Sequence, residues 1–118
     1  MSATVAETFD MFVFQDTPWQ QLVDDVRYLG SAGAGTIWIA DHYMWPPTPE
    51  VPVLESWTTL AALAASTERI RLGTAVTDIA LRNPAMLAKQ IATVDRISGG
   101  RVEVAIGAGY WERELESA

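Results

Sequence analysis

Cysteine is absent from this 118-residue sequence, and histidine occurs only once, as His42. Without cysteine the chain forms no disulfide and offers no thiolate for a metal site or for nucleophilic catalysis. Because protein metal sites are commonly built from cysteine and histidine, a lone imidazole is a poor basis for one. We therefore expect no bound metal ion.

Positive charge is also scarce, since 8 lysines and arginines stand against 15 aspartates and glutamates, and the net charge is -7. Nucleic-acid binding relies on clustered basic residues, so the composition argues against a nucleic-acid partner. No apolar run approaches the roughly 18 residues that a membrane span requires. The start, Met1–Asp10, lacks the basic residues and apolar stretch of a signal peptide. We expect a cytoplasmic protein with no membrane partner.

Hydrophobic residues make up 49% of the sequence, which is enough for a packed core, and we expect residues 1–118 to form a single domain. Four short, mostly apolar and β-prone runs are predicted to be strands. Their apolar residues are continuous rather than alternating, which is typical of strands covered on both faces in a parallel sheet. The predicted strands are residues 9–14, 36–40, 70–77 and 102–106.

Apolar residues at helical spacing fill the intervals between these strands, and the predicted helices cover about residues 18–30, 55–67 and 84–98. In the first helix, Thr17 is predicted to be the cap and Pro18 the first helical residue. Asn83 and Pro84 form the same pair at the third helix, which Gly99 closes. The third helix is the clearest element of the sequence.

The alternation of strand and helix predicts parallel strands joined by right-handed crossovers. Two architectures satisfy it, an open doubly wound sheet and part of a closed barrel. In both, ligands bind beyond the carboxyl ends of the strands. Residues 43–52 hold four prolines, so this segment is predicted to be an ordered loop over one end of the sheet.

The residues that follow the predicted strands are the candidates for a functional site. Histidine is the side chain that titrates near neutrality, so His42 is the candidate general acid or base; the alternative is a structural histidine at a loop start. Neighbours along a strand point to opposite faces, and we expect Asp41 and His42 not to pair directly. Trp45 is a candidate wall for a flat ligand, and Arg82 a candidate for a cofactor anion.

The pair Gly107-x-Gly109 follows the last predicted strand and resembles a dinucleotide fingerprint or the first motif of a methyltransferase. A third glycine is missing, and such motifs normally follow the first strand of their fold. A tight turn after the strand is therefore favoured, although a small methyltransferase-like open sheet remains an alternative.

Several segments, taken in order, closely resemble the luciferase-like monooxygenase superfamily. They are Ala40–Tyr43, Leu54–Ala65, Arg69–Thr74, Leu87–Gln90 and Asp95–Arg101. The resemblance covers essentially the whole chain, and the order of the segments makes it specific. The ending Gly107–Tyr110 is more similar to members that use the deazaflavin coenzyme F420 than to the alkane and sulfonate monooxygenases that use FMN.

This resemblance implies an α/β fold of the (β/α)8, or TIM-barrel, type, in which this chain supplies strands 1–4 and helices 1–3. It implies coenzyme F420 or FMN as cofactor, with the ring across the strand ends. Family members carry a rare non-prolyl cis peptide in a bulge of the third strand, and the matching bond is Ala75-Val76. The implied cofactor-binding residues are Asp41, Ala75, Val76, Thr77, Gly107, Ala108 and Gly109.

The resemblance also implies an activity, hydride transfer between the cofactor and a small organic substrate. Asp41 would contact the polar edge of the ring, and His42 would act as acid or base toward the substrate. Some deazaflavin enzymes have a glutamate where this chain has Tyr110, so that position supplies no second proton-transfer group.

Length is the main departure from the family, because a complete barrel has eight strands in roughly 250 residues. Four parallel strands would also leave two unpaired sheet edges, which natural proteins avoid. We expect a fragment of a longer protein, a split barrel completed by a second chain, or a half-barrel that forms a homo-oligomer. The alternative function is a catalytically silent half-barrel that acts as an oligomerisation or interaction module.

Overall fold

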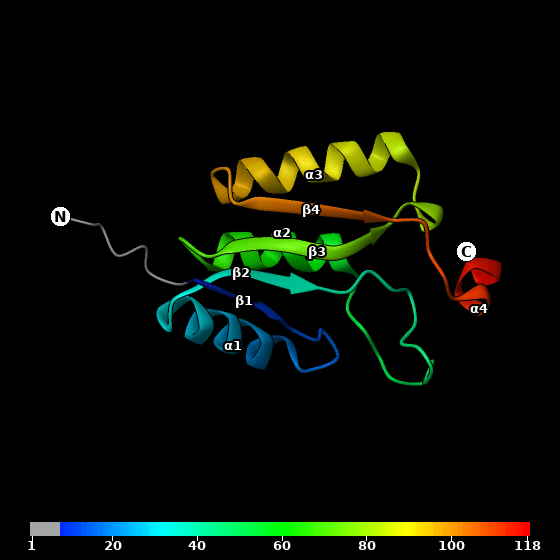
Figure 1. The fold of residues 1–118 in the computed structure, drawn as a ribbon, viewed down its shortest axis with the longest axis horizontal. Coiled ribbons are helices and arrows are strands. Elements are labelled where there is room, and N and C mark those ends of the chain that lie inside the picture. Colours follow the sequence, from blue (N-terminus) through cyan, green and yellow to red (C-terminus); the bar gives the residue numbers. More distant parts are fainter. Residues whose placement is uncertain (1–7) are drawn as a thin grey trace.

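The structure is a computed structural model and describes residues 8–118; the expectation about Met1–Asp10 lies largely outside that range. Four strands alternate with helices along the chain (Figure 1). The elements are β1 (Phe9–Phe12), α1 (Trp19–Ser31), β2 (Ala34–Ile39), α2 (Ser56–Ser66), β3 (Arg71–Asp78), the 3-10 turn η1 (Ile79–Leu81), α3 (Pro84–Ser98), β4 (Val102–Gly107) and α4 (Glu112–Ser117).

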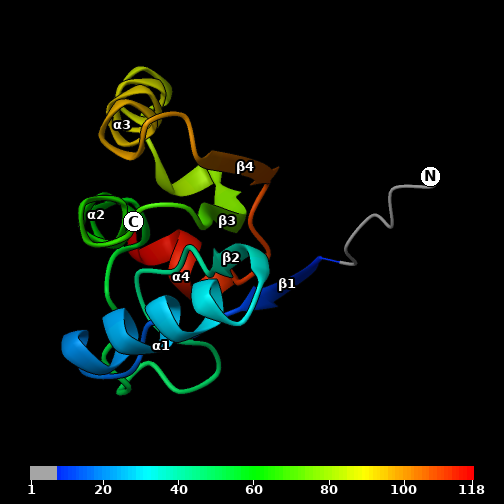
Figure 2. The same cartoon turned by 90° about the vertical axis from the view of Figure 1, so that its left-hand side faces the viewer.

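The four strands form one parallel sheet in the order β1-β2-β3-β4. The helices α1, α2 and α3 all lie on the same side of this sheet, as Figure 2 shows in a view along the strands. A doubly wound sheet reverses its strand order and carries helices on both faces. The consecutive order and the one-sided helices therefore favour a barrel segment, and the open-sheet alternatives, including the methyltransferase-like one, are wrong.

The hydrophobic core lies between the sheet and the three crossover helices. Its central side chains are at most 1% exposed: Leu22, Val26, Ile37, Ile39, Trp57, Leu60, Leu63 and Leu72. Fully burying a side chain of this size contributes about 1.5–3 kcal/mol. This layer makes the sheet a fixed support for whatever lies at the ends of its strands.

The helix boundaries confirm one predicted cap and correct another. Asn83 accepts hydrogen bonds from the backbone of Ala85 (3.0 Å) and Met86 (3.1 Å), and α3 ends at left-handed Gly99 (φ 72°), as predicted. The predicted Thr17 cap is wrong. Pro18 has extended backbone (ψ 141°) and stands outside α1, so Thr17 lies too far from the helix, and its buried hydroxyl has no partner.

Three local predictions need correction. The first strand ends at Phe12 rather than residue 14, and η1 and α4 form where no helix was expected. Glu114 accepts hydrogen bonds from the loop after β2, and these contacts fix α4 beside that loop. Among residues 8–118, no helix has the length and apolar character needed to cross a bilayer.

Candidate active site at the carboxyl ends of the strands

A pocket of about 500 Å³ opens at the carboxyl ends of the strands. In Figure 1 this end lies to the right, where the strand arrows point toward α4 and the proline-rich loop. Segments far apart in the sequence line it: Phe12, Phe14, Ala40, Asp41, His42, Trp45, Pro46, Ala75, Val76, Asp78, Gly107, Ala108, Gly109 and Tyr110. The pocket is where a barrel fold is expected to bind its ligand.

His42 lies at this pocket with its imidazole in a defined orientation. Its Nδ1 is 2.7 Å from Oε2 of Glu114, and 16% of its side chain is exposed. The ring makes edge-to-face contacts with Trp45 (6.0 Å between centroids) and Tyr110 (5.9 Å). No residue in the described range hydrogen-bonds Nε2, so this nitrogen is the one available to a ligand.

Glu114 is the site residue that the sequence did not reveal. Its side chain is only 1% exposed. Besides His42, it accepts hydrogen bonds from the backbone N–H groups of Tyr43 and Met44 through Oε1. The partners are about 70 residues apart in the sequence. An acidic residue among other acidic residues carries no local signal of such a contact.

Asp41 is the centre of a second polar network, directed away from His42. Its carboxylate, 1% exposed, accepts bonds from Ser56 Oγ (2.7 Å), the Asp78 backbone (2.9 Å) and the Arg82 guanidinium (2.8 Å from Nε). The expectation that Asp41 and His42 do not pair is confirmed. Each of the two carboxylate oxygens of Asp41 accepts two hydrogen bonds.

Arg82 is therefore not the free anion ligand that its position suggested. Only 6% of its side chain is exposed, and it is paired with both Asp41 and Glu55. Burial opposes its charge, but the bonds to the two carboxylates prevail and raise the pKa of Arg82 above its ordinary value. Burial likewise opposes ionisation of Glu55, yet hydrogen bonds from Thr58, Arg82 and Trp57 lower its pKa to about 2.

The third strand has an irregular stretch beside the pocket. The pairing of β3 with β4 shifts between Thr74 and Thr77, and the Ala75-Val76 peptide is cis, as expected from the family resemblance. This bulge turns Ala75 and Val76 to the pocket, whereas Thr77 is buried and bonded to Thr74. Of the seven cofactor-binding residues that the family resemblance implies, Thr77 alone does not line the pocket.

The glycine pair at the end of β4 is explained by close packing against the end of β3. A Cβ added at Gly107 would lie 2.3 Å from Cγ2 of Val76. Gly109 has positive φ (79°), and a Cβ there would lie 2.6 Å from Oδ2 of Asp78. The two glycines therefore allow close packing where β4 ends, and the backbone there reaches the pocket edge.

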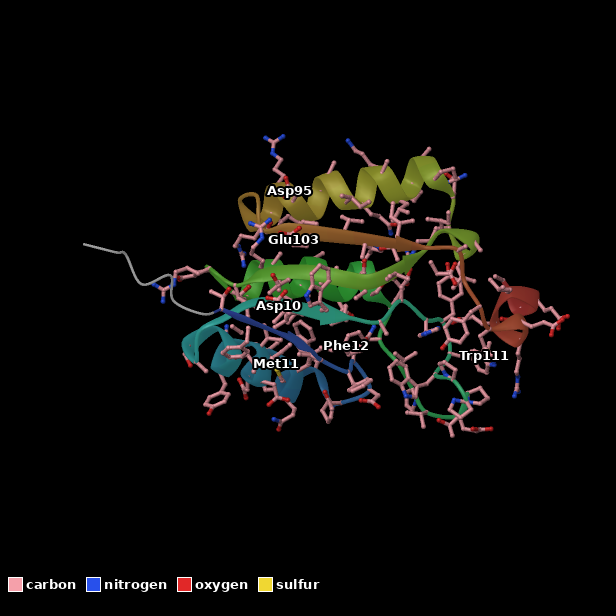
Figure 3. The ribbon with its side chains drawn as sticks, in the orientation of Figure 1. Asp10, Met11, Phe12, Asp95, Glu103 and Trp111 are labelled. Atoms are coloured by element: carbon pink, nitrogen blue, oxygen red, sulfur yellow. The ribbon has the colours of Figure 1, made fainter. Side chains whose placement is uncertain are left out.

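Aromatic side chains form one side of the pocket, and we call Phe12, Phe14 and Trp45 the aromatic wall. Phe14 packs edge-on against Phe12 (5.1 Å) and Trp45 (5.4 Å). In Figure 3, Phe12 is labelled at the end of β1, and Trp111 is labelled farther to the right, beside α4. Trp45 lines the pocket, and its contact with a flat ligand stays a prediction.

The donor set fits a flat, largely apolar ring with a polar edge better than it fits a metal ion. The aromatic wall and Val76 offer apolar surface, and His42 Nε2 and the backbone after β4 offer polar groups. Among residues 8–118, no group of three or more histidine, cysteine, aspartate or glutamate side chains is placed to hold a metal ion.

A family comparison agrees with this geometry, since residues 3–117 match the model of the luciferase-like monooxygenases. The chain belongs to this family. Among its relatives, 5,10-methylenetetrahydromethanopterin reductase of Methanolobus tindarius is 31% identical over 102 residues, 86% of this chain and 29% of that protein.

Solved structures of luciferase-like proteins share the fold. Coenzyme F420-dependent tetrahydromethanopterin reductase from Methanopyrus kandleri superposes with a TM-score of 0.79 at 26% identity, covering 93% of this chain and 29% of that one. The oxygenating constituent of 3,6-diketocamphane monooxygenase from Pseudomonas putida, in complex with FMN, gives 0.74 at 21% identity, covering 94% and 32%. The predicted fold class, part of a luciferase-like TIM barrel, is confirmed. This chain spans less than a third of the length of each of these proteins.

Proposed function

We propose that this chain supplies the N-terminal half of the barrel, strands 1–4, of a flavin- or deazaflavin-dependent oxidoreductase. The cofactor is coenzyme F420 or FMN, and its ring occupies the pocket at the carboxyl ends of β1 to β4. The observation that carries the proposal is the position of His42, whose free Nε2 borders a pocket with an aromatic wall on one side and the β3 bulge on another. Family membership and the names of the relatives support the same chemistry.

The β3 bulge and the glycines at the end of β4 support the ring in this proposal. Val76 is exposed at the pocket and offers an apolar face, while Gly107–Gly109 lets the backbone approach closely. Asp41 acts indirectly, because its carboxylate is fully occupied. It fixes Asp78 and Arg82 at the strand ends. Asp41 also lines the pocket, where its backbone would meet the polar edge of the ring.

His42 handles the proton in the proposed reaction. When bound, a flavin or deazaflavin exchanges a hydride with a carbon atom of the substrate. For oxidation of an alcohol, His42 Nε2 takes the hydroxyl proton as the carbon loses its hydride; for reduction of a carbonyl, a protonated His42 returns the proton to the oxygen. Trp45 and Tyr110, in contact with the imidazole, restrict water beside it.

Completion of the barrel is part of the proposal. Within the described residues, β1 and β4 each pair on one side only. Apolar side chains at these strands are exposed, among them Met11 on β1 and Ile106 (62%) on β4. Further strands, in the same polypeptide, a second chain or a second copy, would cover them and close the site around a small organic substrate.

The same exposed side chains favour a second candidate function, a catalytically silent interaction module. Such a module needs the apolar edges but not the pocket chemistry. The two functions differ in whether the assembled protein binds a cofactor.

Fluorescence titration of FMN and of coenzyme F420, combined with a mass measurement by size-exclusion chromatography and light scattering, separates these functions. We expect saturable binding of one cofactor by an assembly larger than the monomer. A stable assembly that binds neither cofactor would support the interaction module. A folded monomer that binds neither would contradict an enzymatic role for the chain alone.

A further inference from the structure

We infer that Glu114 is a positioning residue that sets the tautomer of His42, so that Nε2 faces the pocket as a hydrogen-bond acceptor. The inference rests on the proposed function only in one respect, that Nε2 of His42 accepts a proton from the substrate. The geometry itself comes from the described contacts of α4 with the loop that follows β2.

The two oxygens of Glu114 have separate partners. Oε1 accepts from the backbone N–H groups of Tyr43 and Met44, and the Met44 bond is 3.2 Å long. A backbone N–H can only donate, so Oε1 is held as an acceptor. Oε2 is thereby left facing His42 Nδ1 at 2.7 Å.

The proton of a neutral His42 is then assigned to Nδ1. A carboxylate oxygen accepts, so Nδ1 must donate to Oε2, and Nε2 keeps its lone pair. This lone pair borders the pocket, where no described residue uses it. A general base that removes a proton from a substrate hydroxyl needs such an unprotonated nitrogen.

The contacts of Glu114 go beyond holding the loop after β2 in place, because its second oxygen lies against the His42 imidazole. Glu114 is 1% exposed and uses both oxygens, whereas Glu112 and Glu116 on the same short helix are exposed. Bonds to Tyr43 and Met44 alone would hold the loop without any effect on the imidazole proton. The proton position is therefore the observable that distinguishes positioning from structural support.

The Glu114→Gln variant provides a sharp test. The amide oxygen of the glutamine can take over both backbone bonds of Oε1, and its NH2 group then faces His42 Nδ1. Because that group only donates, Nδ1 must accept, and the proton moves to Nε2. Glu112→Gln on the exposed face of α4 is the matched control.

The measurement is the 15N spectrum of the imidazole at a pH where the ring is neutral, on the assembled protein without a histidine tag. His42 is the only histidine of the chain, so selective labelling gives one unambiguous signal pair. We expect Nδ1–H in the wild type and in Glu112→Gln, and Nε2–H in Glu114→Gln.

Two results would overturn the inference. One is a wild-type ring that carries its proton on Nε2, and this result needs no variant to fold. The other is a folded Glu114→Gln protein that retains Nδ1–H. Cofactor titration of the same samples decides the proposed function independently, because a switch of tautomer without any cofactor binding upholds the role of Glu114 and contradicts the enzyme.

Discussion

The side chains of Asp41 and His42 leave the end of β2 in different directions and join different networks. The Asp41 carboxylate binds Arg82, 2.8 Å from its Nε, while His42 Nδ1 lies 2.7 Å from Glu114. One network is a buried ion pair that joins β2, α2 and the segment after β3. The other connects the same strand end to α4. Two neighbouring residues thus serve separate tasks, one in stability and one at the pocket.

The Asp41–Arg82 pair predicts a large stability difference between two arginine variants. Arg82→Met leaves a buried carboxylate without its cation, and such a loss costs about 3–5 kcal/mol of unfolding free energy. Arg71→Met is the control, because Arg71 and Glu103 form a pair with 44% and 41% of their side chains exposed. An exposed pair of this kind is worth about 1 kcal/mol or less. Urea unfolding of both variants measures the difference, and equal losses would contradict the role of the buried pair.

Glu55 predicts a defined pH dependence of stability. Its pKa falls from the ordinary 4.5 to about 2 in the fold, so the carboxylate binds its proton less readily when folded than when unfolded. Its contribution is therefore complete above the unfolded value and is lost as the pH falls toward 2. Because part of its side chain faces solvent, the contribution is modest.

Unfolding free energies of the wild type and Glu55→Gln should differ above about pH 5 and converge on acidification to about pH 2. Glu68→Gln, at an exposed position, shows what a change from carboxylate to amide does without the Arg82 contact. A constant difference between wild type and Glu55→Gln across this range would show that the ionised form of Glu55 is not what stabilises the fold.

The close packing of Gly107 against Val76 on the neighbouring strand predicts that a smaller residue at position 76 rescues a larger one at position 107. In Gly107→Ala the new Cβ would lie 2.3 Å from Cγ2 of Val76, so the bulge must move. Overpacking of this kind costs about 1–3 kcal/mol. The double variant with Val76→Ala lacks the clashing methyl group and should recover most of that loss. Thermal or urea unfolding of the single and double variants gives the coupling, and strictly additive losses would count against the contact.

Much of the fold could be predicted because its signals are local. Asn83 and Pro84 mark the start of α3 and Gly99 marks its end, each through its own neighbours in the sequence, and continuous apolar runs mark the strands. Because ligands bind at the carboxyl ends of parallel strands, the predicted strands place His42 and Gly107 at the same site.

The remaining features depend on contacts between distant residues. Glu114 meets the loop after β2 across about 70 positions, and Arg82 meets Asp41 across 41. No periodicity or cap signals such pairs, so the sequence presented Arg82 as a candidate anion ligand and gave no sign of the role of Glu114. The Thr17 cap failed for a local reason, because extended Pro18 delays the start of α1 by one residue.

The central claim, that His42 faces a flavin-type ring in this pocket, is tested most directly by following the 15N signals of His42 during titration with coenzyme F420 or FMN. The assembled protein is used, and the control ligand is adenosine monophosphate, which lacks the flavin-type ring. We expect a saturable shift of Nε2 with one of the two cofactors and none with the control. Saturating cofactor binding that leaves both imidazole signals unchanged would contradict the account.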